Sequence, residues 1–240
     1  MGVRQKVLQF IRSRGYELTR IRPDTTPSTW KQMLLKTYGI TVVFDIGANA
    51  GQYAKGLRDN LGFTGKIFSF EPLSGAFSQL RQNAGSDPQW KVFNAALGDV
   101  CATQEINIAG NSFSSSLLQM LQPHKDAAPT APYIGKETIE VKTLDSVLDG
   151  LCSADDRIFL KIDTQGYESK VIDGAEKSLP RIGTIQLEMS LVPLYEGEML
   201  FNDMHDLLVR KGYSLIYLEP EFVHPSTGQM LQINGTYHRF

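Results

Sequence analysis

The feature that most constrains this chain is a short apolar run that contains an acid and ends in a glycine turn. The letters VVFDIGANAG occupy residues 42–51, and the residues that follow favour a helix. A strand, a tight glycine turn and a helix in this order are typical of the first βαβ unit of a nucleotide-binding α/β fold. Gly47 and Gly51 allow the sharp turn and let a ligand lie close to the backbone. Asp45 lies near the edge where open α/β sheets bind ligands.

The spacing of the turn favours one class of nucleotide over another. A dinucleotide site needs G-x-G-x-x-G, and this turn reads Gly47-x-Asn49-x-Gly51, without the last spacing. An acid in the turn is unfavourable beside a diphosphate but favourable beside S-adenosylmethionine (SAM), which carries an amine and a sulfonium. Glu71 ends the next apolar run, about 20 residues after the turn, where a carboxylate binds ribose hydroxyls. The residues therefore favour SAM, and a purely structural turn is the alternative.

Three segments together resemble the FkbM family of SAM-dependent methyltransferases. They are DIGANAGQY at 45–53, FEP at 70–72 and LKIDTQGYE at 160–168. The resemblance runs from about residue 42 to residue 239, and the third segment is the most specific to the family. It implies an α/β, Rossmann-like class I SAM methyltransferase domain. The seven-stranded sheet is then mostly parallel, with an antiparallel last strand.

The apolar runs of the chain agree with such a sheet. Its expected strands are 42–46, 66–71, 90–95, 158–163, 184–188, 213–219 and 230–239. Two segments of alternating character, 103–108 and 137–142, are predicted to be partner strands joined by a long loop. A loop of this length in a compact domain is usually functional or disordered. The resemblance favours a segment that covers the acceptor, and a solvated surface loop is the alternative.

The chain divides into an N-terminal helical arm or lid, residues 1–38, and a methyltransferase domain, residues 39–240. Residues 2–22 carry six basic side chains and one acid, Glu17, along a loose apolar stripe. We expect an amphipathic helix that packs on the domain or on a second subunit of a homodimer. Peripheral docking to an anionic surface or carrier is the alternative.

Composition sets the remaining limits. A net charge of −2 argues against bulk binding of nucleic acid, and no apolar run is long enough for a membrane span. Cys101 and Cys152 form no paired spacing and fit reduced thiols, so we expect a cytoplasmic protein.

The cofactor contacts are predicted at strand ends and at the glycine turn. Asp45 would bind the amine side of SAM, Glu71 the ribose and Asn94 the adenine edge. The full set of cofactor-binding candidates is Asp45, Gly47, Ala48, Asn49, Gly51, Glu71, Pro72, Asn94, Ala95 and Asp163.

Methyl transfer to a hydroxyl needs alignment and a base. Asp163, at the end of the central strand, is the first candidate for that base, and a turn-capping carboxylate is its alternative. Glu188 would orient the acceptor or share a proton, and Lys161, on the same face as Asp163, would hold it ionised. His124 is either a second base or an exposed loop residue. Ser114 and Ser115 are the candidate polar contacts to the acceptor.

Asp163, Glu188 and His124 could instead bind a divalent cation, but no dense metal-ligand spacing is present and we expect no metal. Three functions remain in view. The resemblance implies an O-methyltransferase acting on a hydroxyl of a sugar in a glycan or of a secondary metabolite. The others are an NAD-dependent oxidoreductase, which would need the missing phosphate glycine, and a non-catalytic scaffold, which would be expected to lose its strand-end acids.

Overall fold

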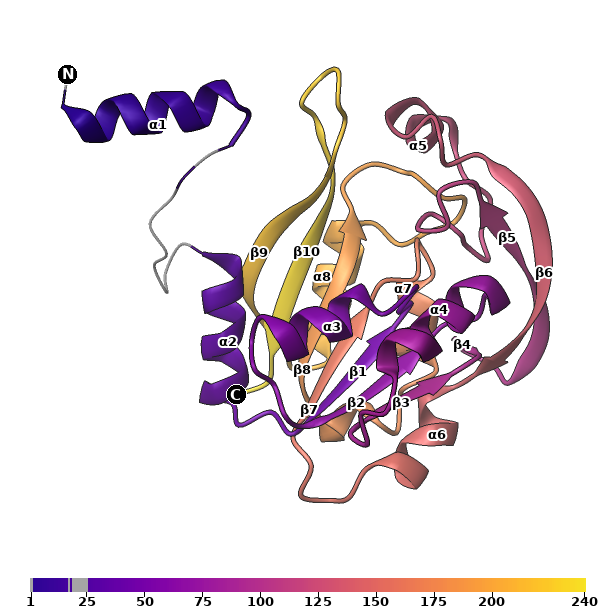
Figure 1. Cartoon of the computed structure of the whole chain (residues 1–240). Helices are drawn as coiled ribbons and strands as arrows, with labels where there is room; N and C mark the ends of the chain where they lie inside the picture. The colour runs from indigo at the N-terminus through magenta and orange to yellow at the C-terminus, as the bar shows by residue number, and fades with distance from the viewer. Residues whose placement is uncertain (1, 17, 19–25) are drawn as a thin grey trace.

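The structure, a computed structural model, describes residues 2–16, residue 18 and residues 26–240 (Figure 1). The expectations for Glu17 and for the basic residues Arg20 and Arg22 lie outside the described residues. From residue 26 onward, two sheets and their helices form the body of the protein. None of the described helices is both long and apolar enough to cross a membrane.

The main sheet has seven strands in the order β3-β2-β1-β7-β8-β10-β9. They are β1 (Val42–Ile46), β2 (Lys66–Phe70), β3 (Trp90–Phe93), β7 (Ile158–Ile162), β8 (Ile182–Ser190), β9 (Ser214–Val223) and β10 (Met230–His238). β10 runs antiparallel to both of its neighbours, and the other pairings are parallel. The expected sheet with an antiparallel last strand is confirmed.

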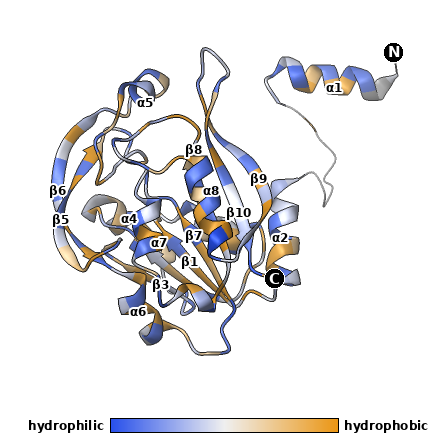
Figure 2. Ribbon diagram, turned by 180° about the vertical axis from the view of Figure 1, so that it is seen from behind, coloured by the Kyte–Doolittle hydropathy of each residue, from blue (hydrophilic) through white to orange (hydrophobic). Residues whose placement is uncertain are grey.

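Helices cover both faces of this sheet (Figure 2). One face packs against α2 (Pro27–Thr37), α3 (Gln52–Asp59) and α4 (Ser74–Ala84). The other packs against α6 (Leu144–Leu151), α7 (Glu168–Asp173) and α8 (Phe201–Arg210). The central strands β1 and β7 are buried at every position, which explains why they are continuous apolar runs rather than alternating ones.

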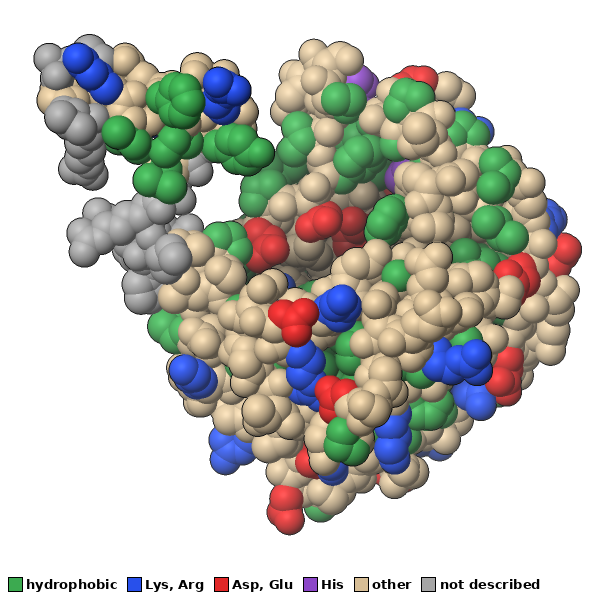
Figure 3. Space-filling view, viewed as in Figure 1, with side chains coloured by type: hydrophobic (Ala, Val, Ile, Leu, Met, Phe, Trp, Pro, Cys, Tyr) green, Lys and Arg blue, Asp and Glu red, His purple; other side chains and the backbone are tan. Residues whose placement is uncertain are grey.

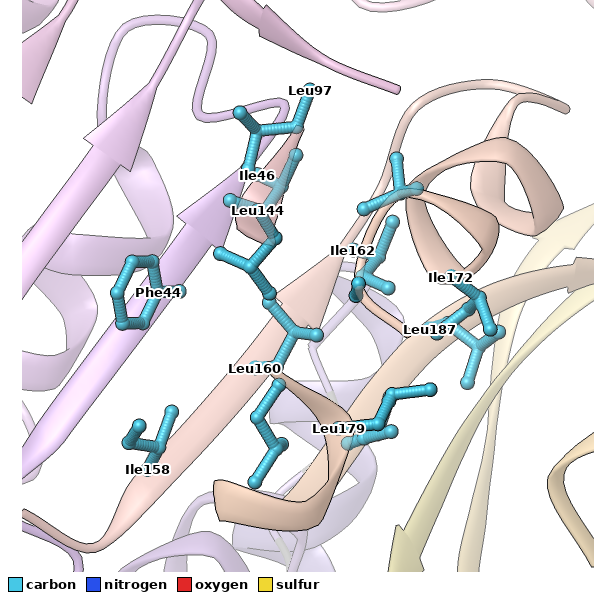
Figure 4. Close-up of a cluster of buried hydrophobic side chains, with 14 of the residues drawn as sticks. Phe44, Ile46, Leu97, Leu144, Ile158, Leu160, Ile162, Ile172, Leu179 and Leu187 are labelled. Carbon is cyan, nitrogen blue, oxygen red and sulfur yellow. The ribbon is translucent and has the colours of Figure 1, made fainter. Parts of the chain in front are cut away.

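The larger core lies under α6, α7 and the 3-10 turn Leu179–Arg181 (Figure 4). Phe44, Leu160 and Leu187 from three neighbouring strands meet Leu144 and Leu179 there. Each fully buried side chain of this size contributes about 1.5–3 kcal/mol through removal of apolar surface from water. This packing fixes the positions of the ends of β1, β7 and β8, and therefore also of the polar residues at those ends.

A second sheet of three strands stands beside the main one. It contains β4 (Ala96–Leu97), β5 (Ala102–Ala109) and β6 (Tyr133–Lys142), in the order β4-β6-β5. The predicted antiparallel pairing of its two long strands is confirmed, with both strands longer than expected. The connection between them, residues 110–132, is called the cover below and includes α5 (Gln122–Ala127).

The N-terminal arm splits into two unlike parts. α2 belongs to the domain core, where Leu34 and Leu35 are buried. α1 (Val3–Ser13) stands apart from the domain in Figure 1, and its Val7 and Phe10 side chains are 49% and 61% exposed. The guanidinium group of Arg14 lies 5.3 Å from the centre of the Phe10 ring. That the apolar face of α1 packs on the domain or on a second subunit stays a prediction.

Candidate functional site

A cavity of about 350 Å³ opens at the carboxyl ends of β1, β2, β7 and β8, under the cover. In Figure 3, acidic side chains lie in the hollow of this face of the molecule. The size lies within the range of small-molecule sites. Its walls come from the strand ends, from β4 and β5, from the cover and from the β9–β10 hairpin.

The glycine turn after β1 forms the floor of the cavity. Gly47 lines it with φ +75°, and a Cβ atom at this position would overlap the backbone carbonyl oxygen of Asp163. Gly51 also has a positive φ, but its environment differs. A Cβ there would meet Leu80 at 2.7 Å and Trp90 at 2.9 Å, so this glycine serves the packing of α3 on its neighbours. Gly51 does not line the cavity.

Glu71 is held at the cavity wall by the glycine turn. Its Oε2 accepts from the backbone N–H of Asn49 at 2.8 Å and its Oε1 from that of Leu73 at 2.9 Å. Burial raises the pKa of Glu71 to about 7, in spite of these two hydrogen bonds. A carboxylate oxygen has more than one acceptor site, so both oxygens can still accept from a pair of ligand hydroxyls. Asn49 and Pro72 line the cavity beside it.

Asp45 is placed differently from the expectation. It is fully buried behind the cavity wall, where Lys161 Nζ lies 3.1 Å from its Oδ1 and Ser69 Oγ donates to its Oδ2 at 3.3 Å. Asp45 and Lys161 are opposite each other in the β1–β7 register, which brings the charges together. The Asp45 carboxylate therefore pairs with Lys161 and Ser69. Asp45 does not line the cavity with Glu71, contrary to the expectation that both would contact the cofactor.

Lys161 connects three groups at the ends of β1 and β7. Besides Asp45, its ammonium lies 3.3 Å from Asp163 Oδ2 and donates to the carbonyl oxygen of Gly47 at 3.2 Å. Burial alone would lower the pKa of Lys161, but the carboxylates of Asp163 and Asp45 raise it, so the ammonium stays charged. The Asp163 side chain is 39% exposed and lines the cavity. The expected contact between Lys161 and Asp163 is therefore present.

Glu188 lies near Asp163 at the cavity wall. Burial, and then the negative charge of Asp163, raise the pKa of Glu188 well above its usual value. Gln165 and Gln232 both line the cavity here, and both donate to Glu188 Oε2, at 2.7 Å and 2.9 Å. Sequence reasoning missed both glutamines. Gln165 lies in the family segment at 160–168. Its position before Gly166, in the turn after the central strand, could have indicated a site residue.

The cover is more ordered than a solvated loop. Ser114 and His124 are buried, and Ser114 Oγ lies 3.0 Å from His124 Nε2. The Nδ1 atom of His124 has no hydrogen-bond partner within the described part of the chain. Burial lowers the pKa of His124 to about 4, so this ring is neutral at physiological pH. Ser115 also lines the cavity, but its hydroxyl donates to Ser112 O at 3.0 Å and so stabilises the local turn.

Three further expected cofactor residues lie outside the cavity wall: Ala48, Asn94 and Ala95. The Asn94 side chain donates to the carbonyl oxygens of Glu71 and Pro72 at 3.0 Å and 2.8 Å. This contact turns the chain, and β3 ends at Phe93 rather than at Ala95. The cavity wall next to β3 is instead formed by apolar residues of β4 and β5: Ala96, Leu97 and Ile106.

The charge of the cavity wall is one-sided. Four carboxylates line it, and no Lys or Arg is found among its described lining residues. The acids are Glu71, Asp163, Glu188 and Glu221. No group of three or more His, Cys, Asp or Glu suited to a metal ion occurs among the described residues. Such a wall is complementary to a cationic ligand with hydroxyl groups, and it is unfavourable for a phosphate.

Comparisons with known proteins bear on this geometry. The model of the Methyltransferase FkbM domain family matches residues 45–215. The 2-O-methyltransferase NoeI of Sinorhizobium fredii is 27% identical over 175 residues, which cover 70% of each chain. A solved FkbM methyltransferase of Methylobacillus flagellatus has a TM-score of 0.47 and 14% identity; the match covers 82% of this chain and 43% of that protein. Magnesium protoporphyrin IX methyltransferase of Synechocystis, solved with bound SAM, has a TM-score of 0.46 and 10% identity, with 100% and 98% of the two chains covered.

The family match spans well over half of the chain and contains the three segments that suggested the resemblance. The sheet, with its antiparallel tenth strand next to the edge, is that of a Rossmann-like class I methyltransferase. The chain belongs to the FkbM family of methyltransferases.

Proposed function

We propose that the protein is a SAM-dependent O-methyltransferase that methylates a hydroxyl group. The observation that carries this proposal is the cavity wall, which has four carboxylates and no described cationic side chain around a glycine turn. A sulfonium and an ammonium are favoured by such a wall. The diphosphate of NAD is not, so the wall argues against the oxidoreductase alternative. The printed name of NoeI, a 2-O-methyltransferase, supports a hydroxyl as the acceptor.

The residues present fit SAM in one orientation. Glu71 would accept from the ribose hydroxyls, as carboxylates at this strand position do in related folds. Leu73, Leu97 and Ile106 give an apolar part of the wall that suits an adenine ring. The turn at Gly47 would hold the amino acid part of the ligand. When bound, the sulfonium supplies the methyl group and leaves as a neutral thioether.

The acceptor would then lie at the other end of the cavity, which we call the acceptor end. It is lined by Asp163, Glu188, Gln232, His124 and Phe222. Asp163 is the most exposed of the acids in direct contact with Lys161, and we assign it the role of the base that takes the hydroxyl proton. The neutral His124 and the glutamine amides offer hydrogen bonds to further acceptor hydroxyls. A sugar or a hydroxylated secondary metabolite has the chemistry to use them.

Two measurements test this function. S-adenosylhomocysteine at about 100 times its dissociation constant should stabilise the fold by about 2.7 kcal/mol. For a domain of this size that is a rise in Tm of about 5–10 °C. NAD should produce no such rise. A response to NAD alone would overturn the proposal in favour of the oxidoreductase.

The role of Asp163 is tested by Asp163→Asn, with Asp173→Asn as the control, because Asp173 is an exposed acid on α7. The first variant should keep its thermal response to S-adenosylhomocysteine and lose about 10²–10⁴-fold in turnover, the usual contribution of a general base. The control should retain both. Turnover would be followed as transfer of labelled methyl to candidate hydroxyl acceptors. Wild-type turnover in Asp163→Asn would remove Asp163 as the base.

A further inference from the structure

The side chain of Gln165 lies between the two carboxylates of the acceptor end. Its Nε2 donates to Asp163 Oδ1 at 3.0 Å and to Glu188 Oε2 at 2.7 Å. Its Oε1 accepts from the hydroxyl of Tyr195 at 2.7 Å. A primary amide has two N–H donors and one carbonyl acceptor, so each of its groups has a matching partner here. A flipped amide would place its oxygen against two carboxylates, and this fixes the orientation.

The backbone around Gln165 is constrained as well. Gln165 has φ +56°, in the left-handed region that residues other than glycine seldom adopt, and Gly166 follows with φ +93°. The carbonyl oxygen of Gln165 accepts from the hydroxyl of Ser116 at 2.7 Å, which ties this turn to the cover. A conformation of this kind persists where the surroundings determine it, and such residues cluster at functional sites.

The two acids have few other donors. Lys161 contacts Asp163 Oδ2, and Gln232 donates to Glu188 Oε2. Gln165 is the one residue, within the described part of the chain, that donates to both acids. Both glutamine contacts to Glu188 fall on Oε2, and no hydrogen bond from a described residue reaches its Oε1. Glu188 lines the cavity, so Oε1 is the oxygen that we infer would face the acceptor.

We propose that Gln165 is a positioning residue of the methyl-transfer site, which holds Asp163 and Glu188 on its two N–H groups while Tyr195 fixes the direction of its amide. The inference rests on the proposed function, because the acids act on the acceptor. Gln165 itself gains and loses no proton. Its effect is to keep one oxygen of each acid in place, so that the acceptor hydroxyl meets Asp163 in a single geometry and gives its proton there.

Two variants separate this role from a purely structural one. Gln165→Met keeps the length of the side chain and removes both donors. Tyr195→Phe removes only the hydroxyl that orients the amide. Tyr213→Phe is the matched control. Tyr213 is buried to a similar extent, its hydroxyl lies within hydrogen-bond distance of the carbonyls of Leu179 and Ile182, and it does not line the cavity.

The first readout does not depend on methyl transfer. Carboxyl ¹³C resonances of Glu188 would be titrated by NMR in the protein with S-adenosylhomocysteine. Loss of a hydrogen bond to a charged carboxylate favours the protonated form, so Gln165→Met should move the midpoint of Glu188 upward by about one pH unit, a tenfold change in proton affinity. Tyr195→Phe should move it in the same direction by less. Tyr213→Phe should leave it in place.

The second readout is turnover. Gln165→Met should lower kcat about 100-fold, the effect of a small misplacement of reacting groups, with KM for SAM unchanged. The acidic limb of its kcat profile should move to higher pH. Unchanged Glu188 midpoints in both Gln165→Met and Tyr195→Phe would overturn the positioning role. A wild-type protein that binds no S-adenosylhomocysteine would overturn the proposed function instead, and the titration without ligand would still decide the role of Gln165.

Discussion

Replacing Gly47 by alanine is the sharpest test of how the cavity is built. Gly47 has φ +75°, and the atom that an added Cβ would overlap is the backbone carbonyl oxygen of Asp163. That carbonyl cannot rotate away freely, because the N–H of its own peptide group, that of Thr164, donates to Glu168 Oε1 at 2.8 Å. The Asp163 N–H donates to the carbonyl oxygen of Ile46 at 3.0 Å and joins β7 to β1. The Gly47 N–H is also engaged, to Phe70 O at 3.1 Å. The ends of β1 and β7 must therefore separate to accept the methyl group.

The expected cost follows from these contacts. The left-handed conformation costs a non-glycine residue about 1–2 kcal/mol. Weakening two buried backbone hydrogen bonds adds about 1–3 kcal/mol for each group left unsatisfied. We therefore expect Gly47→Ala to lose about 3–8 kcal/mol, a large part of the total of about 5–15 kcal/mol for a natural domain. Gly62 is the matched control. It has φ +64° and no atom within 4 Å of an added Cβ, so Gly62→Ala should lose only about 1–2 kcal/mol.

Urea unfolding of both variants measures the difference. On the thermal scale, Gly62→Ala should lower Tm by about 2–8 °C, and Gly47→Ala by about 6–32 °C. Binding of S-adenosylhomocysteine should survive in the Gly62 variant and be lost in the Gly47 variant. Equal losses of stability in the two variants would refute the close approach of the glycine turn to β7.

Three other predictions follow from the same geometry. Lys161→Met leaves the buried Asp45 without its cation and should lower the free energy of unfolding in urea by about 3–5 kcal/mol. Lys66→Met is the control: Lys66 pairs with Asp156, but its side chain is 41% exposed, so the loss should be less than about 1 kcal/mol. Burial raises the pKa of Glu71 to about 7, and ribose hydroxyls need its charged form as an acceptor. Calorimetry should therefore show S-adenosylhomocysteine binding that weakens about tenfold per pH unit below pH 7 with release of a proton, and Glu71→Gln should abolish this dependence. Finally, Phe10→Asp on α1 should leave Tm within about 1 °C, because this side chain is exposed; a clear fall in Tm or in molecular mass would instead show that α1 packs on the domain or on a second subunit.

The main sheet was predictable because its central strands are buried on both faces. Runs such as residues 42–46 and 158–162 contain little else than apolar side chains, and a run of this kind between turn signals has few other structures open to it. The antiparallel closing strand was also expected, and it is confirmed. The ends of strands were less certain. Asn94 illustrates this, since its side-chain contacts to Glu71 and Pro72 end β3 early.

The fate of Asp45 could not be predicted from the sequence. An acid near the end of a strand is visible, but its partner Lys161 lies on another strand more than a hundred residues away. Only the β1–β7 register places the two side by side. His124 shows the same limit. Its burial depends on Ser114 and on the rings of Tyr195 and Phe222, whose centres lie 5.1 Å and 5.3 Å away, and no local pattern announces those contacts.

The position of Lys161 supports the proposed choice of SAM over a dinucleotide. Its ammonium lies behind the wall, where it stabilises Asp45 and Asp163 together with the carbonyl oxygen of Gly47. Lys161 thus pairs with Asp163 from behind, and the described residues of the cavity wall include four acids but no Lys or Arg. A phosphate entering there would meet acids and no Lys or Arg among the described wall residues, whereas a sulfonium would be favoured by whichever of these acids are ionised. The absence of the third glycine of the dinucleotide motif agrees with this wall, because that motif serves to bind a pyrophosphate, which an acidic wall disfavours.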